Sequence, residues 1–115
     1  METPEFTSRL VEWGDMSVDF ESIRAPMDTT ELFKGLPDDR CQCPHWGYVF
    51  KGKFRVKYAD REEVVRAGDA YYLAPGHIPV VEEDTELVEF SPKGLFQQTM
   101  EAVGRNMAAA EEERT

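Results

Sequence analysis

The sequence predicts an all-β barrel or sandwich that is followed by one C-terminal α-helix. Short stretches of alternating apolar and polar residues recur about every ten residues, and Gly or Pro residues separate most of them. After residue 92 this alternation is replaced by apolar residues at helical spacing. With 115 residues the chain is long enough for one hydrophobic core, so we expect a single domain.

The N-terminal part predicts one strand and one short helical turn. Apolar and polar residues alternate over residues 16–20, which is typical of a half-buried strand. Residues 28–31 read Asp-Thr-Thr-Glu, as in a capping box, and Gly35 supplies a glycine stop. We expect a helical turn between these two signals and a loop over residues 36–40.

Residues 48–58 predict a β-hairpin that bends around Gly52. Aromatic and β-branched residues occupy one parity and basic residues the other, so one face of the hairpin is expected to contact the core and the other to contact water. The residues expected to face the core are Tyr48, Phe50, Phe54, Val56 and Tyr58. Further short strands are expected near residues 64–65, 70–73, 79–81 and 86–90.

The C-terminal residues predict an amphipathic helix from about Lys93 to Ala110. Its apolar stripe consists of Leu95, Phe96, Thr99, Met100, Val103, Met107 and Ala110. We expect this stripe to pack on the outside of the barrel, with a partner subunit as the alternative. The acidic residues 111–115 are expected to form a frayed, solvated end.

The composition argues against several classes of function. The formal net charge is −10, so the surface repels phosphate backbones and no nucleic-acid partner is expected. No apolar run approaches the roughly 18 residues of a membrane-spanning helix, and the N-terminus does not resemble a signal peptide. The two cysteines are only two positions apart, which strains a disulfide. We therefore expect a reduced, cytoplasmic protein without a membrane partner.

The two histidines of the sequence both lie at predicted strand edges, and one lies beside both cysteines. Cys41, Cys43 and His45 occupy alternate positions, so a regular strand points them to one face. Together they span about 13 Å, which is too far for all three to bind one ion. Two of them could bind an ion together with His77 from a second strand. All four side chains are therefore candidate metal ligands.

Each candidate ligand also has a simpler interpretation. His45 could be a buried imidazole bonded to a backbone carbonyl or to Asp39, and His77 could be a turn residue with local hydrogen bonds. Cysteines are often small, buried, apolar-like residues. The ligand hypothesis also conflicts with the parity of the hairpin, because His45 is odd whereas the expected core-facing residues are even. A bulge at Trp46–Gly47 would remove this conflict.

The aromatic residues near the histidines are expected in the core, with some at the mouth of a pocket. These residues are Trp46, Tyr48, Phe50, Tyr71 and Tyr72. The candidate ligand-binding residues among them are Trp46, Tyr48, Phe50 and Tyr72. A pocket lined by aromatic rings suits a small molecule, and a tyrosine hydroxyl can orient it.

Residues 41–52 and 68–79 resemble the two motifs of the cupin superfamily, H-x-H-x3-E-x6-G and G-D-x4-P-x-G-x2-H. The spacing C-x3-H-x-G-Y-V-x-x-G is similar to a group of bacterial stand-alone cupins of undefined function. The resemblance covers about residues 40–90 and implies a double-stranded β-helix, which is a jelly-roll-like barrel. It divides one cupin domain, residues 1–115, into an N-terminal arm (1–39), a barrel core (40–91) and a C-terminal helix and tail (92–115).

The usual cupin metal ligands are replaced in this alignment. Asp39, Cys41 and His45 fall on the three ligand positions of the first motif. Pro79 falls on the histidine of the second motif, and His77 lies two positions earlier. This departure places the superfamily's usual metal chemistry below simple ligand binding among the hypotheses.

The leading hypothesis is a cupin that binds a small molecule without redox chemistry, as a homodimeric sensor or accessory protein. The alternative is a metal-dependent enzyme acting on a small polar metabolite, with zinc preferred and iron second because the donors are sulfur and imidazole. A third hypothesis is a purely structural subunit. No residue is assigned a catalytic role. A homodimer is expected from the resemblance and because a small barrel has open sheet edges to protect.

Overall fold

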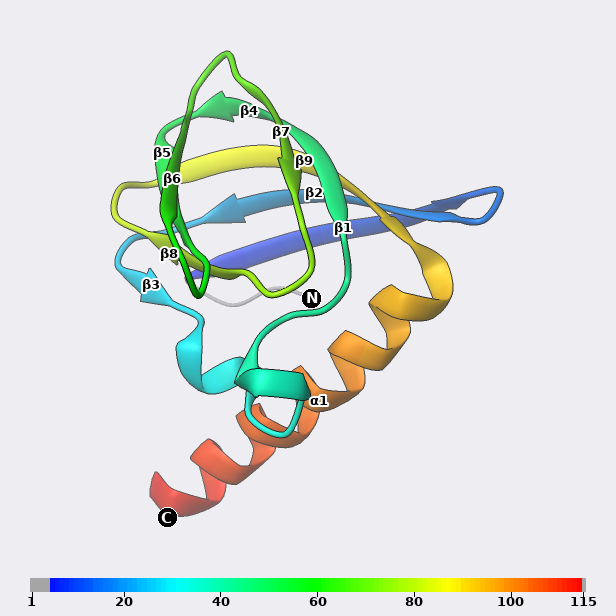
Figure 1. Cartoon of the computed structure of the whole chain (residues 1–115), viewed down its shortest axis with the longest axis vertical. Helices are drawn as coiled ribbons and strands as arrows, with labels where there is room; N and C mark the ends of the chain where they lie inside the picture. Colours follow the sequence, from blue (N-terminus) through cyan, green and yellow to red (C-terminus); the bar gives the residue numbers. More distant parts are fainter. Residues whose placement is uncertain (1–4, 115) are drawn as a thin grey trace.

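Two antiparallel sheets pack face to face, and one long helix lies across an end of this sandwich (Figure 1). The computed structural model describes residues 5–114 of the chain. One sheet has the strand order β1-β2-β9-β4-β7, and the other has the order β3-β8-β5-β6. The prediction of an all-β, jelly-roll-like fold with a short N-terminal helical turn and a C-terminal helix is confirmed.

The bounds of the elements follow the turn signals of the sequence closely. The five-stranded sheet contains β1 (Phe6–Trp13), β2 (Met16–Ile23), β9 (Thr85–Pro92), β4 (His45–Lys51) and β7 (Ala70–Leu73). The four-stranded sheet contains β3 (Met27–Asp28), β8 (Ile78–Val81), β5 (Lys53–Lys57) and β6 (Glu62–Arg66). The helical elements are η1 (Thr30–Phe33), η2 (Pro37–Asp39) and α1 (Lys93–Arg114).

The first two strands form a hairpin that belongs fully to the five-stranded sheet. β1 pairs with β2 along its length, and β2 continues the sheet by pairing with β9. The sequence patterns do not predict β1, because its apolar residues do not alternate cleanly. The segment 36–40, which was expected to be a loop, contains the short 3₁₀ turn η2.

The expected orientation of the hairpin formed by β4 and β5 is wrong for its first strand. On β4 the odd residues point inward, with Val49 fully buried, whereas Tyr48 and Phe50 are exposed. On β5 the even residues Phe54 and Val56 are buried, as expected. The pairing of β4 with β9 shifts between Val49 and Lys51, and the chain then turns. The parity therefore changes at the bend, and β4 needs no bulge at Trp46–Gly47 to point His45 inward.

β2 also differs from what its alternation suggests, because both of its sides contain buried residues, including Val18 on one side and Asp19 on the other. The apolar residue Phe20 is 42 % exposed, whereas Asp19 is buried. The polar residues of this strand, including Glu21, therefore belong to the interior side of the sheet. A pattern of alternation shows that two faces differ, but it does not show which of them faces a polar interior.

The helix α1 covers one end of the sandwich and packs on η1. Phe96 and Val103 join a buried cluster with Phe33 and Ile78 beneath the helix. The Asn106 side chain donates hydrogen bonds to the carbonyls of Leu32 and Lys34. Packing on the outside of the barrel is thus observed.

The helix differs from the expectation in its exposed stripe and its end. The stripe that packs is narrower than expected, because Leu95, Met100 and Met107 are exposed. The helix runs to Arg114, so the expected frayed end is wrong for residues 111–114, whose types favour helix. Residue 115 lies outside the described residues. Across residues 5–114, α1 is the one helix long enough to cross a membrane, and it is too polar to do so.

Candidate metal centre

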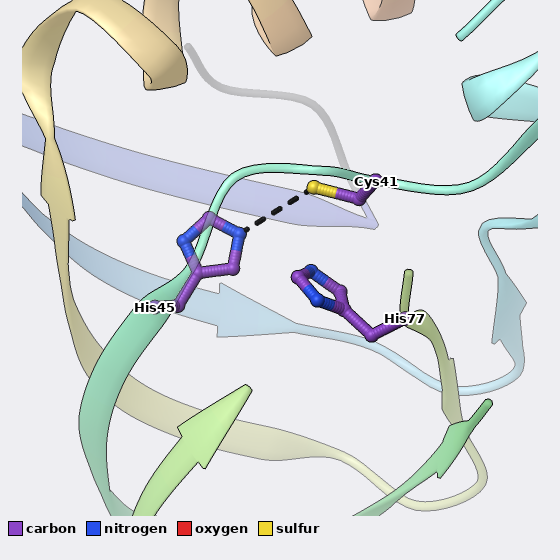
Figure 2. Close-up of side chains that lie close together, drawn as sticks. All are labelled: Cys41, His45 and His77. Carbon is purple, nitrogen blue, oxygen red and sulfur yellow. Dashed lines mark hydrogen bonds between the residues drawn. The ribbon is translucent and has the colours of Figure 1, made fainter. Parts of the chain in front are cut away.

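Three potential metal ligands meet inside the sandwich, at the end covered by α1. They are Cys41, His45 and His77, and their donor atoms all lie within 4.8 Å of one another. All three side chains are buried, with exposed fractions of 2 %, 6 % and 0 %. Figure 2 shows the two imidazole rings close together, with the Cys41 sulfur beside the His45 ring, and the planes of the two rings are inclined by 62°. Cys41 and His45 lie four positions apart on the segment that leads into β4, whereas His77 lies directly before β8.

Backbone hydrogen bonds fix Cys41 next to His77. Cys41 lies in the segment between η2 and β4, and His77 directly precedes β8. The two residues form an isolated antiparallel bridge, in which the Cys41 amide donates to the His77 carbonyl at 3.2 Å. The amide of Gly76 donates to the Cys41 carbonyl in return. The placement of these two side chains is therefore set by the main chain.

The ring of His45 is oriented by contacts on both of its nitrogens. His45 is the first residue of β4, and its Nδ1 lies 2.6 Å from the hydroxyl oxygen of Ser91 on β9. The same nitrogen lies 3.5 Å from a carboxylate oxygen of Glu89. The Nε2 atom points the other way and lies 3.7 Å from the sulfur of Cys41. When Nδ1 carries the proton, Nε2 presents a lone pair to the centre of the group.

His77 carries the most informative atom of the group. Its Nδ1 lies 2.6 Å from the carbonyl oxygen of Ala74, and a carbonyl only accepts, so Nδ1 carries the proton. Its Nε2 is then a bare acceptor, yet this atom is fully buried and has no hydrogen-bond partner among the described residues. A buried polar atom without a partner costs about 1–3 kcal/mol. A metal ion bound to this lone pair would remove that cost.

The electrostatics of the site keep all three donors uncharged. Burial lowers the pKa of His45 to about 4, and burial together with the neighbouring His45 lowers the pKa of His77 to about 4. Burial raises the pKa of the Cys41 thiol to about 11. Near pH 7 both imidazoles are therefore neutral, which is the form that binds a metal, and only the thiol has a proton to lose.

The comparisons with known proteins agree with this architecture. Neither a family sequence model nor a curated protein sequence matches the chain. Among solved structures, a cupin superfamily protein from Desulfitobacterium hafniense is similar over 80 % of this chain and 83 % of its own, with a TM-score of 0.60 and 9 % identity. A cupin-2 domain protein from Shewanella frigidimarina is similar over 79 % of this chain and 84 % of its own, with a TM-score of 0.55 and 14 % identity.

The chain has the cupin fold. A third similar structure is the EutQ protein of Clostridium difficile, with a TM-score of 0.56 and 9 % identity over 76 % of this chain and 68 % of that protein. At these identities the likeness defines the fold and leaves the chemistry of the site to be argued from its own residues.

Two other candidate ligands lie outside the group on this cupin barrel. Cys43 is buried, but its thiol is directed to the carbonyl oxygen of Pro44 at 3.5 Å, and burial raises its pKa to about 12. Asp39 is exposed, and its carboxylate accepts a hydrogen bond from the amide of Gly35. The structure thus brings together one cysteine and both histidines.

Sequence reasoning missed a set of acidic side chains that line the interior beside the metal centre. Asp19 on β2 pairs across the sheet with Glu89 on β9, and Glu21 lies two residues further along β2. The hydroxyl of Tyr71 donates to Glu89 at 2.8 Å. Burial raises the pKa of Glu89 to about 7, and burial and the Glu89 charge raise the pKa of Glu21 well above its usual value. The only signal of these groups in the sequence is the alternation of polar and apolar residues along β2, which does not say that the polar side faces the interior.

The four aromatic residues selected as ligand-binding candidates lie on the opposite side of the sheet from the histidines. Trp46, Tyr48, Phe50 and Tyr72 are 44 %, 40 %, 56 % and 49 % exposed, so their expected place in the core is wrong. Tyr71 points inward and is buried, as expected. The difference follows from the period of a strand, in which neighbouring residues face opposite sides.

Proposed function

We propose that the protein is a metal-dependent enzyme of the cupin fold that acts on a small polar metabolite. Cys41, His45 and His77 hold a divalent transition metal in this proposal. The observation that carries it is the buried Nε2 of His77, which has no hydrogen-bond partner within residues 5–114 and lies beside two further donors. A histidine that served only the core would be expected to bond both of its nitrogens.

The chemistry of the donors supports zinc first and iron second. One thiolate and two neutral imidazoles are the donors that these ions accept in proteins. Binding would remove the proton of Cys41 and so introduce one negative charge beside the divalent ion. The site also needs a reduced thiol, which supports a reducing compartment such as the cytoplasm.

Three protein donors are typical of catalytic rather than structural zinc sites. A bound metal of this kind supplies Lewis-acid polarisation of a substrate or water oxygen. The chain's own residues have separate tasks. Ser91 and the carbonyl of Ala74 orient the two imidazoles, and Glu89 holds a proton close to His45. The cluster beneath α1 that contains Phe96 excludes water from this end of the site.

Cobalt(II) substitution tests the proposal. Metal-free protein titrated with Co²⁺ should develop the visible bands of a low-symmetry site together with a sulfur-to-cobalt charge-transfer band near the ultraviolet. Cys41→Ser should abolish the charge-transfer band. Cys43→Ser is the matched control, because it removes an equally buried thiol outside the group, and it should retain the band. Absence of saturable Co²⁺ binding by the folded wild type would reject the proposal.

A metal-free ligand-binding protein is the second candidate. The observation in its favour is the set of interior carboxyl groups of Asp19, Glu21 and Glu89, which offers acceptors to a ligand that carries an amine. This candidate predicts a metal content near zero after purification without a metal column. It also predicts that a chelator leaves the melting temperature of the wild type unchanged.

A further inference from the structure

The helix α1 lies over the end of the barrel that holds the three candidate donors (Figure 1). Phe96 and Val103 of this helix belong to a buried cluster that also contains Cys41. The hydroxyl oxygen of Thr99, on the same helix, lies 3.8 Å from the Cys41 sulfur. Because each candidate donor is at most 6 % exposed, a solute has almost no contact with them until part of this cover moves.

The side chains beneath α1 form a packing unit of their own. Among the described residues, the cluster that contains Phe33 and Phe96 shares no member with the core between the two sheets. The larger core between the sheets includes Val49, Val56 and Leu73. Small packing units open at a lower free-energy cost than the main core of a protein. Separation of α1 from the barrel therefore leaves the core between the sheets intact.

The first turn of α1 combines an anchored residue with a flexible one. The amide of Lys93 donates to the carbonyl oxygen of Asp15 at 3.0 Å, and Lys93 Nζ lies 2.8 Å from a carboxylate oxygen of Glu12. The next residue is Gly94, although a Cβ atom at this position would lie in open space. Packing therefore does not require a glycine, and glycine loosens a helix relative to alanine. A fixed base followed by a small, flexible residue is typical of a hinge.

The far part of α1 is held in place by one side chain. Among residues 104–113, Asn106 is the one that is not exposed. Its side-chain nitrogen donates hydrogen bonds to the carbonyl oxygens of Leu32 at 2.7 Å and Lys34 at 2.9 Å. Asn106 lies about 18 Å farther along the helix than Gly94, at roughly 1.5 Å per residue. A small rotation at the hinge is therefore enough to break both hydrogen bonds.

We propose that α1 is a lid that rotates about Gly94, releases Asn106 from the η1 segment and uncovers the space around Cys41. The argument uses only the burial of Cys41 and the contacts of α1, so it holds with or without a bound metal. In the closed position the lid returns Thr99 to the sulfur and excludes water from this end of the barrel. In the open position it admits an ion or a small metabolite.

The reaction rate of the Cys41 thiol with Ellman's reagent measures the population of the open lid. The experiment uses the full chain with Cys43→Ser, in the presence of a chelator. The reference is a thiol introduced by Val56→Cys in a variant that lacks both native cysteines. Because Val56 is fully buried between the sheets, this reference thiol reports global unfolding. After each rate is divided by that of the same variant in urea, Cys41 should react at least about tenfold faster than the reference.

Two substitutions distant from Cys41 should change its rate in opposite directions. Asn106→Ala removes the hydrogen bonds to the η1 segment and should raise the rate roughly tenfold relative to the reference thiol in the same background. Gly94→Ala fits without a clash, restricts the hinge and should lower the rate about threefold. Arg105→Ala, on the exposed side of α1, is the matched control and should have no effect.

Equal rates for Cys41 and the reference thiol would overturn the proposal, because Cys41 would then react only when the whole chain unfolds. An unchanged Cys41 rate in folded Asn106→Ala would also overturn it. If that variant does not fold, an unchanged rate in Gly94→Ala overturns the proposal on its own. These rates are measured without metal, so a failure of Co²⁺ binding concerns only the proposed function and leaves the test of the lid unaffected.

Discussion

The two sides of β4 show opposite chemistry on one short strand. His45, Gly47 and Val49 point into the sandwich, whereas Trp46 and Phe50 point outward from the same sheet. The inner side carries the candidate metal donor His45, a glycine and the fully buried Val49, and the outer side carries large aromatic rings. Large aromatic rings normally lie on the inner side of a half-buried strand, so their place on β4 is unusual. The exposed aromatic rings of β4 therefore lie on the side of the sheet that faces away from the candidate metal centre.

The largest expected effect is a loss of Zn²⁺ affinity when His45 is replaced, compared with its neighbour Trp46. His45→Ala removes one of three donors, so the affinity for Zn²⁺ should fall roughly a thousandfold, or about 4 kcal/mol. Trp46→Ala changes the adjacent residue on the other side of the sheet and should change the affinity by less than about twofold. Competition with a chromophoric chelator measures both. Equal losses in the two variants would show that the effect on binding is indirect.

The second expected effect is on the free energy of unfolding, which should fall more for a substitution at Gly47 than for one at Tyr48. A Cβ atom at Gly47 would meet the ring of Tyr71, and it would lie 2.5 Å from the carbonyl oxygen of Val88. Because that oxygen belongs to the main chain of β9, Gly47→Ala should destabilise the fold by about 3 kcal/mol. Tyr48→Ala on the outer side should lower the free energy of unfolding by less than about 1 kcal/mol. Urea unfolding of dilute, metal-free samples measures both, and a neutral Gly47→Ala would contradict the inward packing of β4.

The third expected effect is a pH-dependent change in melting temperature when the interior carboxyl group of Glu21 is replaced. The folded state keeps the proton of Glu21 at pH values where the unfolded chain releases it, because its pKa is raised. Folding stability is therefore lost as the pH rises above the pKa of a glutamate in the unfolded chain. Glu21→Gln should raise the melting temperature by about 4 °C at pH 8, or roughly 1 kcal/mol, with no gain at pH 4.

The control for this pH effect is Glu101→Gln, which removes an exposed charge on α1. It should leave the melting temperature unchanged at both pH values. If Glu21→Gln is destabilising at pH 8, its charged form is needed for the fold and the account of the acidic interior is wrong.

The smallest effect should come from Thr99 on α1. Its hydroxyl lies 3.8 Å from the Cys41 sulfur, at the range of a weak hydrogen bond to sulfur. Thr99→Val keeps the shape, and it should shift the sulfur-to-cobalt charge-transfer band and weaken metal binding only about threefold. Val103→Ala perturbs the packing of the same helix without touching the sulfur, and it should leave the band in place. An unchanged band in Thr99→Val would show that α1 has no contact with the donor.

The sequence predicts most of the fold because its turns are marked by glycine and proline residues. β5, β7, β8 and β9 lie where the patterns place them. The orientation of β2 and β4 could not be read in the same way, because alternation does not identify which face is interior. The bulge that reverses the parity after Val49 is a local feature of pairing with β9.

The candidate site was only partly accessible from the sequence. Residue type and spacing single out Cys41, His45 and His77, but they do not distinguish Cys41 from Cys43. That choice depends on the bridge between Cys41 and His77, which joins segments 36 residues apart. The acidic groups beside the site depend on the register of β2 with β9, which is also a long-range property.

The most direct test of the central claim is anomalous diffraction from a crystal of protein purified without a metal column and supplied with zinc. Data collected on both sides of the zinc absorption edge locate the ion without assumptions about its ligands. The account predicts a single strong peak enclosed by Cys41 Sγ, His45 Nε2 and His77 Nε2. A structure with no peak among these three atoms, in which His77 Nε2 instead bonds a water molecule, would contradict it.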